Sequence, residues 1–104
     1  MNGRYFLVVS LWLRNNDVAA FEAFERQAAK AMVKFDGRIE RAIRISSGGY
    51  EGEGPFEVHI VSFPNESAFQ MYRQSSESKT IAEARENVIS KTVIHPGKEV
   101  ATYP

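Results

Sequence analysis

The sequence contains two histidines, and histidine is the side chain that exchanges a proton most readily near neutral pH. His59 lies inside an apolar segment that reads as a strand, so its imidazole is a candidate general acid or base. The alternative is a hydrogen-bonded histidine with a structural role in a core or an interface. His95 precedes Pro96 at the end of a strand-like segment, where we expect an exposed side chain without a chemical role.

Arg44 is the second candidate for a chemical role. A hairpin between residues 38–46 and 56–63 places it opposite Glu57 or His59, on the same face of the sheet. A guanidinium binds a carboxylate or an enolate through two parallel hydrogen bonds, so Arg44 could hold a substrate anion. In the alternative interpretation, Arg44 and Glu57 form a cross-strand ion pair that joins the two strands.

Two aromatic side chains could shape a binding pocket. Trp12 could stack on a planar ligand, but it could equally fill the core of a dimer interface, where aromatic residues are enriched. Tyr72 could donate a proton to a substrate oxygen. More simply, Tyr72 packs a helix against the sheet and leaves its hydroxyl at the rim.

The composition excludes several classes of site. The chain has 13 Lys+Arg against 13 Asp+Glu, and this balance argues against a nucleic-acid-binding protein, which needs surplus positive charge. It has Cys 0, so it has no disulfide and no cysteine nucleophile or ligand. The two histidines lack the spacing of metal ligands, and the glycines of residues 47–55 precede a strand instead of opening a helix, unlike a phosphate-binding loop. We therefore expect no metal and no cofactor.

The elements that position these residues follow from periodicity and from breakers. Strands are predicted at residues 5–14, 38–46, 56–63 and 92–95. A helix with an apolar stripe begins at an Asn16 cap and ends at Gly37, and a second helix begins at an Asn65 cap, breaks at Ser75-Ser76 and resumes over residues 77–89. No apolar run approaches the roughly 20 residues of a membrane-spanning helix, so we expect a cytoplasmic protein without a membrane partner.

The predicted order β-α-β-β-α-β is typical of the ferredoxin-like α+β sandwich, a four-stranded antiparallel sheet with both helices on one face. We expect the whole chain, residues 1–104, to form one such domain. The first and third strands occupy the middle of that sheet, and they are the most apolar strands of the sequence.

The sheet face without helices carries a second expectation. We assign one set of side chains to that face and the other set to the helices. The open-face set is Phe6, Val8, Ser10, Trp12, Ala42, Arg44, His59, Val61 and Phe63, and the helix-side set is Tyr5, Leu7, Val9, Leu11, Ile39, Ile43, Val58 and Ile60. A large apolar patch is costly to leave in water. We therefore expect a homodimer in which a second copy covers the open face.

Residues 55–85 carry a resemblance to a known family. They contain a hydrophobic strand ending in Phe63-Pro64, a polar cap at 65–68, an aromatic at Tyr72 and a serine-led segment at 76–79, in which Lys79 replaces the usual aromatic. This pattern resembles a small bacterial family of uncharacterised function within the dimeric α/β-barrel superfamily. The resemblance implies relatives that include cofactor-free antibiotic-biosynthesis monooxygenases, lactone isomerases, haem-degrading enzymes and stress-responsive proteins. Haem is disfavoured, because the haem-degrading relatives use a helix histidine and neither predicted helix contains one.

Two functions follow from this resemblance. In the first, the protein is a cofactor-free monooxygenase or isomerase that acts on a small aromatic or polyketide-like molecule. Arg44 would then hold an anion, His59 would move a proton, and Trp12 and Tyr72 would shape the pocket. In the alternative, it is a non-catalytic dimer that binds a small molecule or responds to stress.

Overall fold

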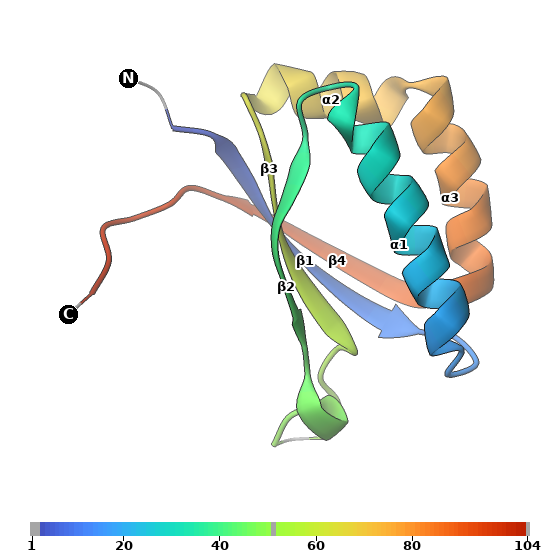
Figure 1. The fold of residues 1–104 in the computed structure, drawn as a ribbon. Helices are drawn as coiled ribbons and strands as arrows, with labels where there is room; N and C mark the ends of the chain where they lie inside the picture. Colours follow the sequence, from blue (N-terminus) through green and yellow to red (C-terminus); the bar gives the residue numbers. More distant parts are fainter. Residues whose placement is uncertain (1–2, 51, 104) are drawn as a thin grey trace.

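The computed structural model describes residues 3–50 and 52–103. Its elements are β1 (Tyr5–Leu13), α1 (Val18–Val33), β2 (Arg38–Arg44), the short 3-10 helix η1 (Ser46–Gly48), β3 (Glu57–Phe63), α2 (Glu66–Gln74), α3 (Ser76–Val88) and β4 (Ile89–Gly97). The strands form one antiparallel sheet in the order β2-β3-β1-β4, and the helices lie on one side of it (Figure 1). The predicted ferredoxin-like fold is confirmed, with β1 and β3 in the centre.

The helix boundaries follow from local capping. Asn65 caps α2 by accepting a hydrogen bond from the Ala68 amide, and Ser75 ends α2 and caps α3, as the serine pair predicted. The cap of α1 is Asp17, whose carboxylate accepts from the Ala20 amide at 3.0 Å. The prediction of Asn16 as this cap is therefore wrong by one residue.

The end of α1 also differs from the prediction. The residue in the left-handed conformation is Asp36, with φ 58°, and not Gly37. Gly37 is required for a different reason, because a Cβ at this position would overlap the ring of Phe63. The glycine allows the chain to pass close to the central strand β3.

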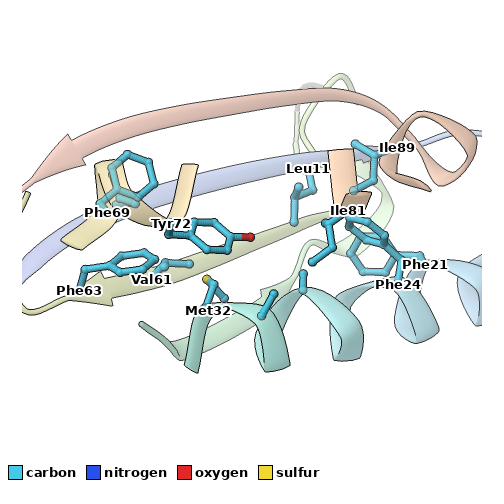
Figure 2. Packing of buried hydrophobic residues seen from close by; sticks show 13 residues of the cluster. Leu11, Phe21, Phe24, Met32, Val61, Phe63, Phe69, Tyr72, Ile81 and Ile89 are labelled. Carbon is cyan, nitrogen blue, oxygen red and sulfur yellow. The ribbon is translucent and has the colours of Figure 1, made fainter. Parts of the chain in front are cut away.

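The core lies between the sheet and the helices. Figure 2 shows Tyr72 lying between the strands and α1, with its hydroxyl directed into the cluster of buried side chains. The cluster comprises Leu7, Leu11, Phe21, Phe24, Ala28, Ala31, Met32, Val61, Phe63, Phe69, Tyr72, Ile81 and Ile89. Aromatic rings of α2 pack on Phe63, with centroid distances of 5.3 Å to Phe69 and 5.6 Å to Tyr72.

The register of β3 corrects the predicted assignment of faces. Leu7 is paired with Val61 and Val9 with His59, and paired residues share a face. Because Leu7 is buried against the helices, His59, Val61 and Phe63 also face the helices, and Val58 and Ile60 face the open side. The prediction had these two sets reversed.

A bulge in β2 corrects that strand as well. The pairing of β2 with β3 shifts between Ile39 and Arg41, so Ile39 faces the helices while Ile43, paired with Val58, faces the open side. Ala42 and Arg44 pair with His59 and Glu57 and therefore lie on the helix side, opposite to the prediction. In the part of the chain that the structure describes, no helix is long and apolar enough to cross a membrane.

Candidate active site

A cavity of about 90 Å³ lies between the sheet and the helices. Most of its wall is apolar and comes from the core cluster. Five side chains in the wall carry polar groups: Glu25 of α1, His59 of β3, Tyr72 of α2, Arg85 of α3 and Thr92 of β4. An apolar pocket with a few convergent polar groups is the usual form of a small-molecule site.

His59 lies between two carboxylates in this wall. It is only 3% exposed, its Nε2 lies 2.6 Å from Oε2 of Glu57, and its Nδ1 lies 3.7 Å from Oε1 of Glu25. Because a carboxylate only accepts hydrogen bonds, the short contact assigns the proton of a neutral imidazole to Nε2. Nδ1 then presents a lone pair toward Glu25, which makes it the proton acceptor at the cavity.

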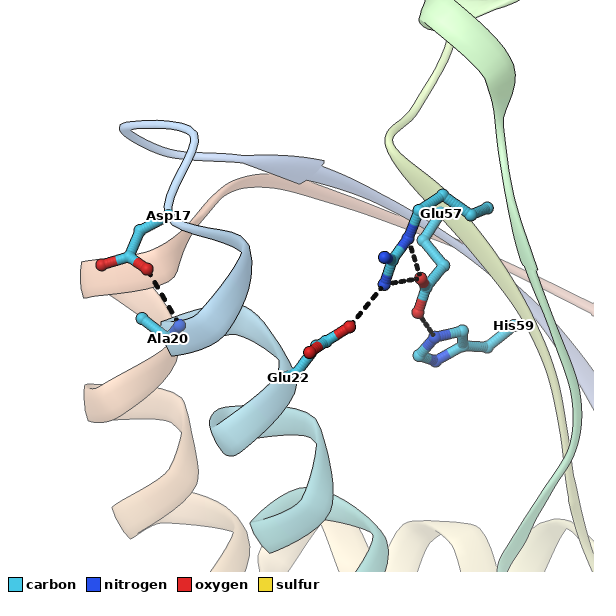
Figure 3. Close-up of polar contacts among 6 residues, drawn as sticks. Asp17, Ala20, Glu22, Glu57 and His59 are labelled. Atoms are coloured by element: carbon cyan, nitrogen blue, oxygen red, sulfur yellow. Dashed lines mark hydrogen bonds and ion pairs between the residues drawn. The ribbon is translucent and has the colours of Figure 1, made fainter.

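Glu57 connects His59 to the surface. Its Oε1 accepts hydrogen bonds from Nε and Nη2 of Arg44 at 3.0 and 2.8 Å, and Nη2 also donates to Oε2 of Glu22 at 3.2 Å (Figure 3). The Arg44 guanidinium also lies 4.6 Å from the centre of the Phe56 ring. Of the two predicted roles of Arg44, the structure contains the cross-strand ion pair, and Arg44 is not among the residues that line the cavity.

Glu25 is the polar residue of the cavity that the sequence analysis missed on α1. Its Oε2 is buried and has no hydrogen-bond partner in the described structure. Burial raises the pKa of the Glu25 carboxyl above its usual range, although the charges of His59 and Arg85 partly offset this effect. A buried carboxyl with a raised pKa holds its proton more tightly than an exposed one, which is a common property of residues that transfer protons.

Tyr72 lies in the same wall, and its role in shaping a binding pocket stays a prediction. It packs against Phe35 and Phe63, and burial raises the pKa of its hydroxyl while the nearby charge of Arg85 partly lowers it. A hydroxyl with a raised pKa stays protonated at neutral pH and therefore can donate a hydrogen bond to a ligand.

Trp12 lies away from this cavity. It belongs to the open face of β1, where its Nε1 donates to the Glu53 carbonyl at 3.3 Å and the Lys91 ammonium lies 4.7 Å from its ring centre. It therefore cannot share a pocket with His59 as the sequence analysis expected. His95 is exposed on the open face of β4, in agreement with its predicted surface position.

The sequence did contain a signal for Glu25 and Arg85, the two charged residues of the cavity wall that were not predicted. Glu25 follows the buried Phe21 by four positions, and Arg85 follows the buried Ile81 by four positions. A charged residue in that position shares the buried face of its helix. Among the described residues, no group of three side chains could hold a metal ion.

Comparison with known proteins identifies the fold. No protein-family model matches the chain, and the comparison with curated proteins gives no match. Solved structures match over nearly the whole chain. SnoaB, a cofactor-independent oxygenase from Streptomyces nogalater, has a TM-score of 0.74 at 14% identity, and the match covers 99% of each of the two chains.

Two further structures have the same architecture. A protein of unknown function from Rhodopseudomonas palustris has a TM-score of 0.78 at 14% identity, covering 98% of this chain and 86% of that one. A NIPSNAP family protein with unknown function from Agrobacterium tumefaciens has a TM-score of 0.70 at 14% identity, covering 97% and 92%. The chain shares the ferredoxin-like α+β fold of these structures. At these identities the likeness concerns the fold, and the site residues must be argued from their own geometry.

Proposed function

We propose that this protein is a cofactor-free enzyme that removes a proton from a small aromatic or enolisable molecule held in the cavity. The observation that supports this function is the pair formed by His59 and Glu25, which face each other across 3.7 Å in the wall of an apolar cavity. Proton removal is the first step of both predicted reactions, oxygenation and isomerisation. SnoaB, which has the same fold, is a cofactor-independent oxygenase.

The acceptor in this proposal is Nδ1 of His59. A proton from an O–H or an acidic C–H of the substrate passes to the Nδ1 lone pair and forms an imidazolium. Glu57 stabilises this cation at 2.6 Å, because its carboxylate accepts the Nε2–H bond. Glu25 lies next to the newly protonated nitrogen and can carry the proton onward. The hydroxyl of Tyr72 can donate to the oxygen on which the negative charge gathers.

The two reactions then differ in the fate of the substrate anion. In an isomerisation, the proton returns to another carbon and no oxidant is consumed. In an oxygenation, the anion reduces molecular oxygen, so that a CH₂ group and O₂ give a carbonyl and water, with all four electrons supplied by the substrate. Both routes run without a metal or an organic cofactor.

The size of the cavity restricts the substrate. An engineered apolar cavity of about 150 Å³ accommodates benzene, whereas this cavity measures about 90 Å³. It therefore accepts the reacting end of a ligand, such as a short enolisable group or one ring with modest side-chain movement. A polycyclic polyketide, which the sequence analysis allowed, extends beyond it.

Deuterium exchange tests this function without knowledge of the natural substrate. Small 1,3-diketones and phenols are incubated anaerobically in D₂O with the protein, and incorporation of deuterium at their acidic C–H positions is followed by NMR. We expect exchange faster than in buffer, and a loss of about 10²-fold or more in His59→Gln. Glu83→Gln, on the exposed side of α3, serves as the matched control. Binding without accelerated exchange would instead support the non-catalytic small-molecule-binding alternative.

We also propose that a second copy of the chain covers the open sheet face. Apolar side chains from all four strands lie on it: Phe6, Val8, Trp12, Ile43, Val58, Ile60 and Val93. Val8 and Ile43 are exposed, at 37% and 48%. A second copy presents the same apolar face under two-fold symmetry, and a chain with +0 net charge does not repel its copy.

A cytoplasmic location stays a prediction from the sequence.

A further inference from the structure

A cleft adjoins the cavity where α3 meets β4. Its volume is about 610 Å³, which lies in the range of small-molecule sites. Arg85, Ile89 and Thr92 line both the cleft and the cavity. These three side chains therefore form the boundary between the two spaces.

Arg85 is the charged residue at this junction. It is half-buried on α3, and within residues 3–50 and 52–103 its side chain forms no hydrogen bond or ion pair. Arg44, on β2, is by contrast paired with two carboxylates. A guanidinium that lines an apolar cavity and donates no hydrogen bond to the described residues is available to an anionic ligand.

The cleft as a whole favours negative charge. Arg14 and Arg85 line it against one acidic residue, Glu86, and the third cationic residue of its lining, Lys91, has its ammonium over the Trp12 ring. The backbone amide of Arg14 is fixed by a hydrogen bond of 2.8 Å to the Val88 carbonyl, so this residue is anchored beside the end of α3. Like-signed charges around a concave surface concentrate ligands of the opposite sign.

We propose that the cavity and the cleft form one two-part site for an amphipathic organic acid. The apolar end of the ligand enters the cavity beside His59, and its carboxylate binds the Arg85 guanidinium at the junction. This inference adds a substrate class to the proposed function and rests on it for the reaction alone. Binding of the acid at one end directs the other end toward His59 and Glu25, which is how a remote charge positions a reacting group.

A matched pair of probes tests the inference. Phenylacetate and its neutral amide, phenylacetamide, have the same ring and differ in charge. At low salt we expect the acid to bind about tenfold or more tightly than the amide, measured by calorimetric titration. In ¹³C-methyl NMR, the acid should shift the signal of Met32, which lines the cavity. The signal of Met71, which is exposed on α2, should not change.

Four variants separate the contributions of charge. Arg85→Gln should reduce the affinity for the acid about tenfold and leave that for the amide unchanged, and Arg85→Lys should retain part of the affinity. Glu86→Gln should tighten binding of the acid, because it removes the negative side chain of the cleft. Arg26→Gln, at an exposed position on α1, is the control and should change neither affinity.

These experiments distinguish failure of the two-part site from failure of the proposed proton removal. Equal affinities for acid and amide, equal losses in Arg85→Gln and Arg26→Gln, or no binding of either probe at millimolar concentration would overturn the two-part site. Acid binding that depends on Arg85, combined with no deuterium exchange in any diketone or phenol, would uphold the anion site and refute proton removal.

Discussion

Oε2 of Glu57 lies 2.6 Å from Nε2 of His59, two residues further along the same face of β3. Arg44 holds the other oxygen of the same carboxylate, and Glu22 of α1 holds Arg44. The orientation of a buried imidazole is thus determined by an ion pair that reaches the protein surface. This arrangement assigns Glu57 a positioning role in the proposed reaction, because it touches His59 and does not line the cavity.

Glu57→Gln should lower both stability and proton transfer. The variant breaks a buried ion pair, and we expect a loss of about 1–3 kcal/mol in the free energy of unfolding, measured by denaturant titration. Deuterium exchange should also fall, because the neutral amide stabilises the imidazolium less. Glu83→Gln, the same substitution at an exposed position on α3, is the control. Unchanged exchange in a folded Glu57→Gln variant would leave Glu57 with a structural role only.

Glu25→Gln should change how stability depends on pH. The raised pKa of Glu25 means that the folded protein binds its proton more tightly than the unfolded chain does. Its contribution to stability is therefore complete below the unfolded pKa of about 4.3 and is lost as pH rises from there through the folded pKa. The amide does not titrate, so the variant should gain stability relative to the wild type as pH rises above about 4.3.

Thermal melting across this pH range measures that difference. We expect the melting temperature of Glu25→Gln to rise relative to that of the wild type as pH increases. Glu83→Gln should follow the wild-type curve, because Glu83 is exposed. A difference that shrinks as pH rises contradicts the assigned direction.

Gly37→Ala should destabilise the fold by about 1–3 kcal/mol, because the added methyl group overlaps the ring of Phe63 in a filled core. Gly97→Ala provides the matched control, since nothing lies within 4 Å of a Cβ at that position. Chemical denaturation of the two variants measures the contrast. Equal stabilities would show that Phe63 moves aside without cost.

Val8→Lys should dissociate the proposed dimer. Val8 lies in the centre of the open face, and a buried lysine without a partner is costly in an interface. Sedimentation equilibrium at micromolar concentration should give a dimer for the wild type and a single chain for the variant. Val33→Lys adds the same charge at an exposed position on α1 and should remain dimeric. A wild-type protein that sediments as a folded single chain excludes the proposal.

The sequence predicted the element order because its breakers are strong. Pro64, the Ser75-Ser76 pair and the glycine-rich segment separate runs of clear periodicity, and the structure has its boundaries within a few residues of them. The faces of β3 were harder to predict. Val58 and Ile60 on one side and Val61 and Phe63 on the other are equally apolar, so hydrophobic alternation does not distinguish them.

The prediction of the candidate site depended on knowing which residues of β3 face the helices. Glu57 and His59 occupy core-facing positions, and polar residues are assigned to a core only when their partners are known. Arg44 and Glu22 supply those partners from two other elements. The bulge between Ile39 and Arg41 brings Arg44 to the helix side. No residue type in that segment predicts a bulge.

The two ends of the proposed site belong to different layers, with His59 on the central strand β3 and Arg85 on α3. A bound acid would therefore cross-link helix and sheet. Ile81 is the buried residue of α3, so few contacts of its own hold this helix on the sheet. The backbone amides of α3 should therefore exchange with solvent more slowly when the acid is bound, and this slowing reports binding.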